Sequence, residues 1–453
     1  MSTTANRPNI VFLFSDQQRW DTVGAYGEIE SVTPNLDRLA GEGVLFENAF
    51  TCQPVCGPAR ACIQTGKYAT ETGCYVNNIA LPADERTIAH VFNDAGYQTA
   101  YVGKWHLAST GDHENYKTKP VPPERRGGWD DYWVASDVLE FTSHGYDGHM
   151  FDKDGNRRDF PEGRYRADAT ADFALEFLRR QRYPSRPFCL MVSWIEPHHQ
   201  NDNDRFEGPQ GSPERFGHIP PPSDLTATDA EGDYRQGWPE YLGCCASLDE
   251  NVGRIRDTLK ELGLADNTVI VYTSDHGCHF RTRNAEYKRS CHESSIRIPM
   301  IAAGGSFRGG KVVRELVSLI DLPPTLLDEA GLDVPDTMRG RPLGKLTAGE
   351  ADDWPGEVFL QISEDHVGRA IRTRKWKYAV WVPSTRGWSG TDQPGSDVYQ
   401  ERFLYDLDAD PDETNNLVTD PALGEVRCEL ARRLKRRMVQ AGEPEPEIRP
   451  AAD

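Results

Sequence analysis

The hydrophobic residues in the first three quarters of the chain follow two alternating patterns. Short continuous apolar runs, typical of strands buried on both faces, lie at 10–14, 98–102, 188–194, 268–273 and 299–303. Between them, apolar residues recur every third or fourth position, as in amphipathic helices, at 33–42, 87–95, 168–182, 242–262 and 322–330. Strands that alternate with helices predict an α/β fold, with a mostly parallel sheet covered by helices on both faces.

The pattern changes near residue 345. Four short strand-like segments and then one helical segment follow at 358–362, 368–372, 377–382, 403–406 and 423–441. We therefore divide the chain into a large domain, residues 1–345, and a C-terminal subdomain, residues 346–453, with a small antiparallel sheet and a closing helix. The polar, Pro-rich segment 200–240 is expected to form a long loop, and the Pro- and Glu-rich residues 443–453 are expected to be frayed.

The amino-acid composition excludes several classes of protein. Apolar residues make up 38% of the 453 residues, which is enough for a sizeable core and excludes disorder as the main state. The net charge of −20 disfavours binding to nucleic acid or to anionic membranes. No apolar run approaches the roughly 20 residues that span a bilayer, and no signal peptide is visible, so we expect a cytoplasmic protein.

Polar residues that could bind a metal follow two of the predicted strands. Asp16 and Gln17 come after the first strand, and Asp275 and His276 come after the strand at 268–273. The carboxyl ends of parallel strands meet at one edge of a sheet, and ligands bind there. Carboxylate and amide oxygens suit a hard cation. One such pair alone fits a capped turn better than a metal site, but two pairs at strand ends favour a metal site.

One cysteine lies in a distinctive string. Residues 56–60 are Cys-Gly-Pro-Ala-Arg, and Thr-Gly follows at 65–66. A plain cysteine nucleophile would need a histidine base nearby, and none is close in the sequence. The string resembles the C-x-P-[SA]-R signature, followed by T-G, of the type I sulfatases of the alkaline phosphatase superfamily. In that family a formylglycine-generating enzyme converts the cysteine to formylglycine, so the resemblance implies this modification at Cys56.

Further motifs similar to those of the type I sulfatases follow in the family's order. They are G-K-W-H-L at 103–107, P-H at 197–198, D-H-G at 275–277, K-R-S-C-H-E at 288–293, and the segments 372–378 and 404–407. The chain departs from the family pattern at Ala108, where a glycine is usual, and at His292, where Tyr or Phe is usual. The resemblance spans about residues 7–420, nearly the whole chain.

The resemblance implies an alkaline-phosphatase-like α/β/α sandwich with the small antiparallel sheet and helix beside it. It also implies one divalent cation, most often calcium, held by Asp16, Gln17, Asp275, His276 and the modified Cys56. Many sulfatases have Asp-Asp and Asp-Asn at the two pairs. The Gln and His of this chain lower the ligand charge and add an imidazole nitrogen, so manganese is the second candidate.

The resemblance further implies transesterification followed by elimination. A hydroxyl of the hydrated formylglycine attacks the sulfur of a sulfate ester and expels the alcohol, and loss of the second hydroxyl's proton then releases sulfate. The implied roles are metal-site geometry for Arg60, binding of sulfate oxygens for Lys104 and Lys288, base in the elimination for His106, protonation of the leaving oxygen for His198 or Lys288, and substrate contact for Asn77.

Other functions stay open at this point. The Asp-Gln and Asp-His pairs also occur in choline-sulfatase-like enzymes and phosphonate monoester hydrolases, so a phosphonate monoester or phosphodiester hydrolase is the closest rival. A non-catalytic protein that binds a metal through an unmodified cysteine is a third hypothesis. Residues 127–148, rich in Trp, Tyr and Asp, fit a sugar-binding or a packed insertion equally well.

The expected partners follow from the same resemblance. We expect a small-molecule or saccharide sulfate ester as substrate, with a sugar or aryl sulfate ahead of a quaternary amine. The formylglycine-generating enzyme is the expected maturation partner. We expect no nucleic-acid or membrane partner, and the sequence leaves homo-oligomerisation open.

Overall fold

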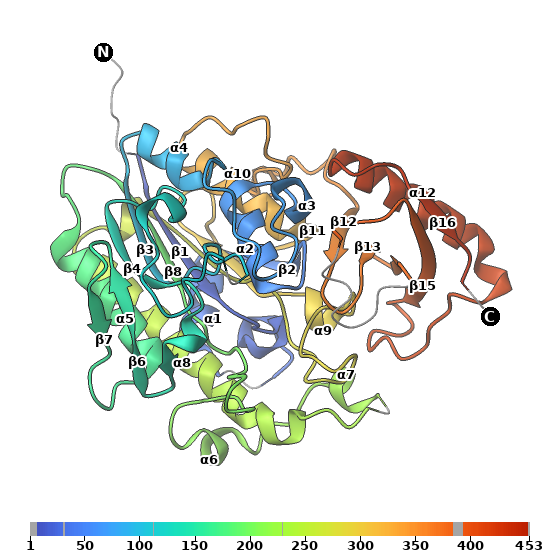
Figure 1. The fold of residues 1–453 in the computed structure, drawn as a ribbon, viewed down its shortest axis with the longest axis horizontal. Coiled ribbons are helices and arrows are strands. Elements are labelled where there is room, and N and C mark those ends of the chain that lie inside the picture. Colours follow the sequence, from blue (N-terminus) through green and yellow to red (C-terminus); the bar gives the residue numbers. More distant parts are fainter. Residues whose placement is uncertain (1–6, 30–31, 112, 229, 384–392, 452–453) are drawn as a thin grey trace.

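A computed structural model describes residues 7–451, apart from 30–31, 112, 229 and 384–392. Within these residues, a sheet of eleven strands carries helices on both faces, and a second sheet of five strands lies beside it (Figure 1). The large sheet has the strand order β11-β2-β10-β9-β1-β8-β3-β4-β6-β5, and β7 pairs with β6. Its strands are β1 Asn9–Ser15, β2 Val44–Phe50, β3 Gln98–Lys104, β4 Tyr132–Ser136, β5 Ser143–His144, β6 Asp147–Asp152, β7 Arg157–Asp159, β8 Phe188–Ser193, β9 Thr268–Ser274, β10 Met300–Ala303 and β11 Lys311–Ser318.

The centre of the large sheet is parallel. β1 pairs in parallel with β8 and β9, and β3 pairs in parallel with β8 and β4. β10 is antiparallel to both of its neighbours, and β6 is antiparallel to β4. The predicted α/β fold with a mostly parallel sheet is therefore confirmed. Because β1 lies between two parallel neighbours, its carboxyl end opens onto the edge where such sheets bind ligands.

Alternate residues of β1 build the two halves of the core. Ile10, Phe12 and Phe14 pack into the layer that contains α2, α4 and α10, whereas Val11 and Leu13 pack into the layer that contains α1, α5 and α8. This period of two is the geometry of a strand that is buried on both faces. The helices of these layers are α1 Pro34–Glu42, α2 Cys56–Thr65, α4 Ile88–Asp94, α5 Arg166–Glu176, α8 Tyr234–Glu261 and α10 Leu322–Glu329.

The small sheet is antiparallel from β12 to β15, as predicted, and the closing helix α12 packs its apolar side chains against it. Its elements are β12 Glu357–Ile362, β13 Gly368–Thr373, β14 Trp376–Trp381, β15 Val398–Asp406, α12 Gly424–Gln440 and β16 Glu447–Arg449. In the part of the tail that the structure describes, up to residue 451, the expectation of fraying is wrong, because β16 pairs in parallel with β15. The domain boundary at residue 345 falls within α11 (Gly344–Thr347), and the division itself stays a prediction.

Two other segments differ from the expected pattern. Residues 200–240 are not one long loop, because they contain α6 (Ser212–Phe216), α7 (Ser223–Thr226) and the first turns of α8. The helix expected at 168–182 is α-helical only to Glu176 and continues as a π-helix over Phe177–Gln181. None of the helices in the described residues combines the length and the apolar character needed to cross a membrane.

Candidate active site

Two neighbouring strand ends bring the predicted metal ligands together. β1 and β9 pair in register up to Ser15 and Ser274, so the residues that follow, Asp16 and Asp275, leave the sheet side by side. Both carboxylates are fully buried. The backbone N–H of Gln17 donates to Asp275 Oδ1 at 2.9 Å, which ties the two loops together. The sheet register therefore explains why residues far apart in sequence share one site.

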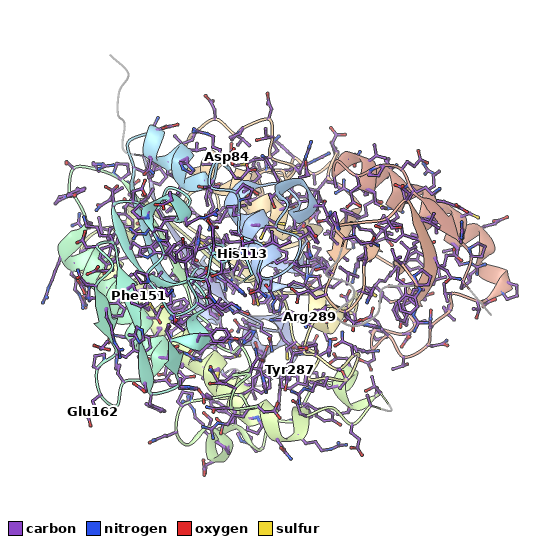
Figure 2. All side chains as sticks on the ribbon, in the orientation of Figure 1. Asp84, His113, Phe151, Glu162, Tyr287 and Arg289 are labelled. Atoms are coloured by element: carbon purple, nitrogen blue, oxygen red, sulfur yellow. The ribbon has the colours of Figure 1, made fainter. Side chains whose placement is uncertain are left out.

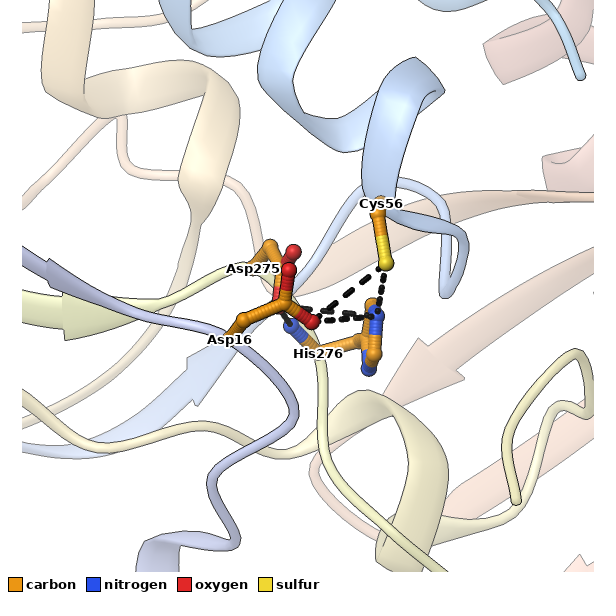
Figure 3. Close-up of side chains that lie close together, drawn as sticks. All are labelled: Asp16, Cys56, Asp275 and His276. Carbon is orange, nitrogen blue, oxygen red and sulfur yellow. Dashed lines mark hydrogen bonds and ion pairs between the residues drawn. The ribbon is translucent and has the colours of Figure 1, made fainter. Parts of the chain in front are cut away.

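Cys56 reaches the same point from a helix terminus. It is the first residue of α2, and its Sγ lies 3.3 Å from Asp16 Oδ1 and 3.3 Å from His276 Nε2 (Figure 3). Donor atoms of Asp16, Cys56, Asp275 and His276 all lie within 4.8 Å of one another. The start of a helix also carries a partial positive charge that favours an anionic group. The geometry thus gathers sulfur, oxygen and nitrogen donors around one centre.

The amide of Gln17 lies at the edge of this group. Its Oε1 is 3.3 Å from Lys288 Nζ, and its Nε2 is 3.5 Å from Cys278 Sγ. The backbone of Gln17 is left-handed, with φ of 71°. Non-glycine residues adopt this conformation rarely, and they do so mainly where the surrounding structure enforces it at a functional site. Gln17 Oε1 is the fifth donor of the predicted set.

Electrostatics indicate that the donor set fits a divalent cation. Burial, and after it the charge of Asp16, raises the pKa of Asp275 to about 7. Asp275 Oδ2 has no hydrogen-bond partner among the described residues. Burial also opposes ionisation of Asp16, but Lys104, His198 and Arg60 hold its pKa well below the usual range. Two converging carboxylates, a sulfur, an imidazole and an amide oxygen are a plausible shell for a cation that would offset their repulsion.

Arg60 and Lys104 flank the carboxylates. Arg60 Nη2 lies 2.9 Å from Asp16 Oδ2, and its Nη1 donates to Ser193 Oγ and to the Lys104 carbonyl, each at 2.7 Å. Lys104 Nζ lies 2.7 Å from Asp16 Oδ2. Both cations are buried, so these ion pairs act without much screening by solvent. Arg60, one helical turn after Cys56, therefore links α2 to the ends of β1, β3 and β8.

Lys288 and His198 approach the thiol from the other side. Lys288 Nζ lies 2.9 Å from Cys56 Sγ and 3.0 Å from His198 Nε2. Burial disfavours the Cys56 thiolate, but Lys104, Lys288 and His276 together lower the pKa of this thiol well below its ordinary value. Burial and then Lys288 lower the pKa of His198, whereas the charges of Cys56 and Asp16 outweigh burial and raise the pKa of Lys288. The pair therefore consists of a neutral imidazole beside an ammonium group.

His106 and Asn77 complete the predicted set. The His106 side chain is a hydrogen-bond neighbour that contributes to the low pKa of Cys56, and its Nδ1 is buried without a partner among the described residues. His106 is also left-handed, with φ of 60°. Asn77 Oδ1 accepts a hydrogen bond from the Gly57 backbone at 2.9 Å. All the predicted site residues thus lie around the first turn of α2.

The structure adds residues that sequence reasoning missed. Glu140 lies 3.5 Å from His198 Nδ1, and the buried Glu364 accepts a hydrogen bond from the Asn77 backbone at 2.6 Å. Glu364 follows the predicted strand at 358–362 and Glu140 lies in the segment 127–148, but neither residue belongs to a recognised motif that would assign it to the site. In the segment 127–148, Trp129 and Trp133 are fully buried, which favours the packed interpretation for these two aromatic residues.

Comparison with known proteins identifies the family. The Sulfatase family model matches residues 8–332, and the model described as N-sulphoglucosamine sulphohydrolase, C-terminal, matches residues 285–440. The chain is 30% identical to an ulvan-active sulfatase of Formosa agariphila, over 96% of this chain and 82% of that protein.

Two solved structures share nearly the whole fold. The crystal structure of the yidJ protein from Bacteroides fragilis has a TM-score of 0.83 and 27% identity, with 98% of each chain covered. A second protein, solved in complex with its substrate D-glucosamine-2-N,6-O-disulfate, has a TM-score of 0.77 and 25% identity, with 97% of this chain and 99% of that chain covered. The Sulfatase model includes every predicted site residue. The chain therefore belongs to the sulfatase family and is a sulfuric ester hydrolase.

Proposed function

We propose that this enzyme hydrolyses a sulfate ester of a saccharide, with residue 56 as the nucleophile after its conversion to formylglycine. The observation that carries the proposal is the position of Cys56, whose Sγ lies within 3.3 Å of a carboxylate, an imidazole and an ammonium group. The carboxylate and the imidazole are metal-ligand types that follow the ends of β1 and β9, and the ammonium group is a cation beside them. They suit a group that is held on a cation.

We propose a divalent cation, calcium first and manganese second, held by Asp16, Gln17, Asp275, His276 and the modified residue 56. When bound, the cation would act as a Lewis acid for the hydrated aldehyde and would orient the sulfate group. Two features of Asp275 support a cation at this position: its pKa is raised to about 7, and its Oδ2, 3.7 Å from Arg60 Nε, accepts no hydrogen bond from the described residues. Arg60 would keep Asp16 ionised and oriented, because its guanidinium contacts this carboxylate directly.

Lys104 and Lys288 would bind the sulfate oxygens. Both ammonium groups are buried beside Cys56, so each would meet a sulfate oxygen with little competition from water. Sulfate esters carry one negative charge in the ground state, and the leaving oxygen gains charge as its bond to sulfur breaks. Two fixed cations at this place would therefore stabilise the transition state more than the free substrate.

Proton transfer to the leaving oxygen would involve Lys288 and His198 together. Lys288 carries a raised pKa, and its Nζ faces the Nε2 of a neutral His198 at 3.0 Å. His198 Nδ1 in turn lies 2.6 Å from the His199 carbonyl, which favours the tautomer with its proton on Nδ1. Nε2 then accepts a hydrogen bond from the Lys288 ammonium group and orients it, and Lys288 would give a proton from another of its N–H bonds to the leaving oxygen. His106, beside residue 56, would remove the proton in the elimination that releases sulfate.

A saccharide sulfate is favoured by two of the similar proteins. One is named for its activity on ulvan, and the other was solved with a sulfated glucosamine. The Sulfatase model covers all the predicted site residues, which favours a sulfate ester over the rival phosphonate monoester or phosphodiester. A choline-like amine sulfate has no such support.

A paired rate assay tests this function. The protein is produced with and without a formylglycine-generating enzyme, and the fraction of residue 56 present as the aldehyde is measured by mass spectrometry. Rates on 4-nitrophenyl sulfate, a 4-nitrophenyl phosphonate monoester and 6-O-sulfated glucosamine are then compared with calcium or manganese. We expect sulfate turnover in proportion to the aldehyde fraction. Faster phosphonate turnover, or equal rates for the unmodified protein, would contradict the proposal.

A further inference from the structure

The loop between β12 and β13 connects the small sheet to the nucleophile helix. In this loop, residues 363–367, Glu364 is buried, with 2% of its surface exposed. Its Oε1 accepts a hydrogen bond from the Asn77 backbone at 2.6 Å, and its Oε2 lies 3.5 Å from Asn77 Nδ2. Asn77 Oδ1 accepts from the Gly57 N–H at 2.9 Å. Two consecutive hydrogen-bond contacts thus join Glu364 to the residue that follows Cys56.

Arg289 links Glu364 back to the loop that precedes Cys56. Its Nη2 lies 2.6 Å from Glu364 Oε2, and its backbone N–H donates to the Pro54 carbonyl at 3.2 Å. The preceding residue, Lys288, places its Nζ 2.9 Å from Cys56 Sγ. Figure 2 shows Arg289 near α9, between the two sheets. The same short segment therefore contacts the nucleophile directly through Lys288 and indirectly through Arg289.

The backbone at both ends of the ion pair is strained. Arg289 and Glu364 each have φ of 70°, in the left-handed region that non-glycine residues seldom adopt. Gln17 and His106, which belong to the predicted site, adopt the same region. Such conformations cost free energy and persist only where neighbouring contacts enforce them, most often at functional sites. A buried ion pair between two strained residues is thus part of the site's construction.

Asn77 fits tightly against the start of α2. The first N–H groups of a helix have no partner within the helix, and Asn77 provides one for Gly57 from outside. A Cβ at Gly57 would lie 3.0 Å from Asn77 Oδ1 and 3.4 Å from the His106 carbonyl, so only glycine fits without displacement. Any movement of Asn77 therefore changes the hydrogen bonding of the turn that carries residue 56.

We propose that Glu364 is a positioning residue that acts through Asn77, with Arg289 holding its carboxylate in place. This inference rests on the proposed role of residue 56 as the nucleophile. Glu364 fixes the Asn77 backbone, Asn77 fixes the Gly57 amide, and the side chain of residue 56 is thereby aimed at the proposed cation. The role of Asn77 is then orientation of the nucleophile, in addition to the substrate contact predicted from the family.

A double-mutant cycle tests this relay. The variants are Glu364→Ala, Asn77→Ala and the double variant, each assayed for kcat and KM on 4-nitrophenyl sulfate per molecule of aldehyde-containing protein. We expect Glu364→Ala to lower kcat by about 100-fold, because small displacements of reacting groups have effects of this size, with little change in KM. The double variant should be no slower than the slower single variant, since both changes break the same connection.

Two further variants separate positioning from general stability. Glu443→Ala removes another buried Arg–Glu pair of the C-terminal subdomain, in which both carboxylate oxygens lie 2.8 Å from Arg369 Nε. It should lower the Tm but leave kcat unchanged at temperatures well below the Tm. Glu364→Gln keeps an acceptor for Asn77 and loses only the charge that faces Arg289, so it should recover most of the lost kcat.

The outcomes that overturn the proposal are specific. If Glu364→Ala lowers the Tm but keeps the wild-type kcat, or if the losses of Glu364→Ala and Asn77→Ala multiply in the double variant, Glu364 does not act through Asn77. A wild-type enzyme that turns over without the aldehyde would instead contradict the proposed nucleophile. The two failures are therefore distinguishable. If Glu364→Ala does not fold, Glu364→Met, which keeps the side-chain length but offers Asn77 no carboxylate, takes its place with the same expected loss of kcat.

Discussion

Among the largely buried clusters of charged side chains in the described residues, two are built in opposite ways. The first surrounds Cys56 at the ends of the central strands. The second, which we call the interface cluster, consists of Glu293, Arg372, Lys377 and Glu413, and it joins α9 (Glu293–Ile296) to the small sheet. In the interface cluster Lys377 Nζ lies 2.7 Å from Glu293 Oε1 and also pairs with Glu413, while Arg372 lies 3.3 Å from Glu293 Oε2.

The difference lies in what each charge faces. In the interface cluster every acid meets a base, and within the described residues none of its four members has a buried polar atom without a hydrogen-bond partner. Around Cys56, two carboxylates and a thiol converge, and Asp275 Oδ2 has no hydrogen-bond partner in the described part of the chain. The interface cluster joins two parts of the fold through fully hydrogen-bonded ion pairs. Around Cys56, acidic groups converge on one point although Arg60, Lys104 and Lys288 flank them, and a carboxylate oxygen there accepts no hydrogen bond, as is typical of a functional site.

The largest expected effect comes from removing the nucleophile. Cys56→Ala should lower turnover of 4-nitrophenyl sulfate by about 10⁴-fold or more, because loss of a nucleophile removes the covalent route. The far-UV circular dichroism spectrum and the cooperative unfolding should remain those of the wild type. Retention of sulfatase activity by this variant would show that residue 56 is not the nucleophile.

Replacing one converging carboxylate should separate activity from stability. Asp275→Asn should lower kcat by at least about 100-fold, since even partners of metal ligands have effects of 10- to 100-fold. After chelation its Tm should equal or exceed that of the wild type, because burial, and after it the charge of Asp16, raises the pKa of Asp275 to about 7 and disfavours its carboxylate in the folded state.

Addition of a cation is the second half of this experiment. Calcium or manganese should raise the Tm of the chelated wild type, since a ligand that binds only the folded state stabilises it. The increase should be much smaller for Asp275→Asn. An equal increase in both proteins would place the cation at a different site.

A change in the interface cluster should lower stability and leave activity unchanged, which is the reverse of the effect expected for Asp275→Asn. Lys377→Met leaves the buried Glu413 and the partly buried Glu293 without their shared partner, so we expect the free energy of unfolding to fall by about 3–5 kcal/mol. The kcat of the folded enzyme at 25 °C should be preserved. Lys375→Met is the matched control: Lys375 is half exposed and pairs with Asp406, so its loss should cost only about 0–1 kcal/mol. Loss of kcat in Lys377→Met would show that the interface cluster also contributes to catalysis and is not only structural.

The smallest expected effect is on the pH dependence of stability. Burial, with Arg283 as the next cause, holds the pKa of His292 well below its ordinary value of 6.5. The unfolded chain therefore binds a proton at His292 below pH 6.5 that the folded chain does not, and stability falls as the pH is lowered.

His292→Phe, which restores an aromatic residue of the family pattern, should remove this contribution of about 1.4 kcal/mol per pH unit between pH 6.5 and 5. Denaturant unfolding at several pH values measures the slope. The pKa of His279 is also lowered, to about 4, by burial. Part of the pH dependence of stability should therefore remain in His292→Phe. An unchanged slope in His292→Phe would assign the acid sensitivity to other groups.

The site could be predicted from the sequence wherever a local signal coincided with a strand end. Asp16 and Asp275 follow apolar runs, and parallel pairing of these strands places them together. The roles of Lys104 and Lys288 required the family resemblance, because a single lysine carries no local signal. Glu364 was missed because it acts on Asn77, 287 positions earlier in the chain, and hydrophobic periodicity contains no information on such a contact.

Prediction of the fold from the sequence was limited in the same way. β2 has polar residues in its middle and β11 is partly exposed, so neither forms the continuous apolar run that indicates a buried strand. β16 is only three residues long, and its pairing with the edge of β15 depends on where the chain returns after α12. Tertiary contacts determine that β2, β11 and β16 are strands. β1, β3, β8 and β9 can instead be recognised from their own amino-acid composition.

The burial of Cys56 sets an order of events during synthesis. With 1% of its surface exposed, the folded residue offers no access to an enzyme that would convert its thiol. Glu364 belongs to the last part of the chain to be made, and a ribosome adding 5–20 residues per second needs about 15–60 s to translate the roughly 300 residues between Cys56 and Glu364. The proposed conversion would therefore have up to about a minute before Glu364 and the small sheet pack against Asn77, and the buried site would then shield the aldehyde from solvent.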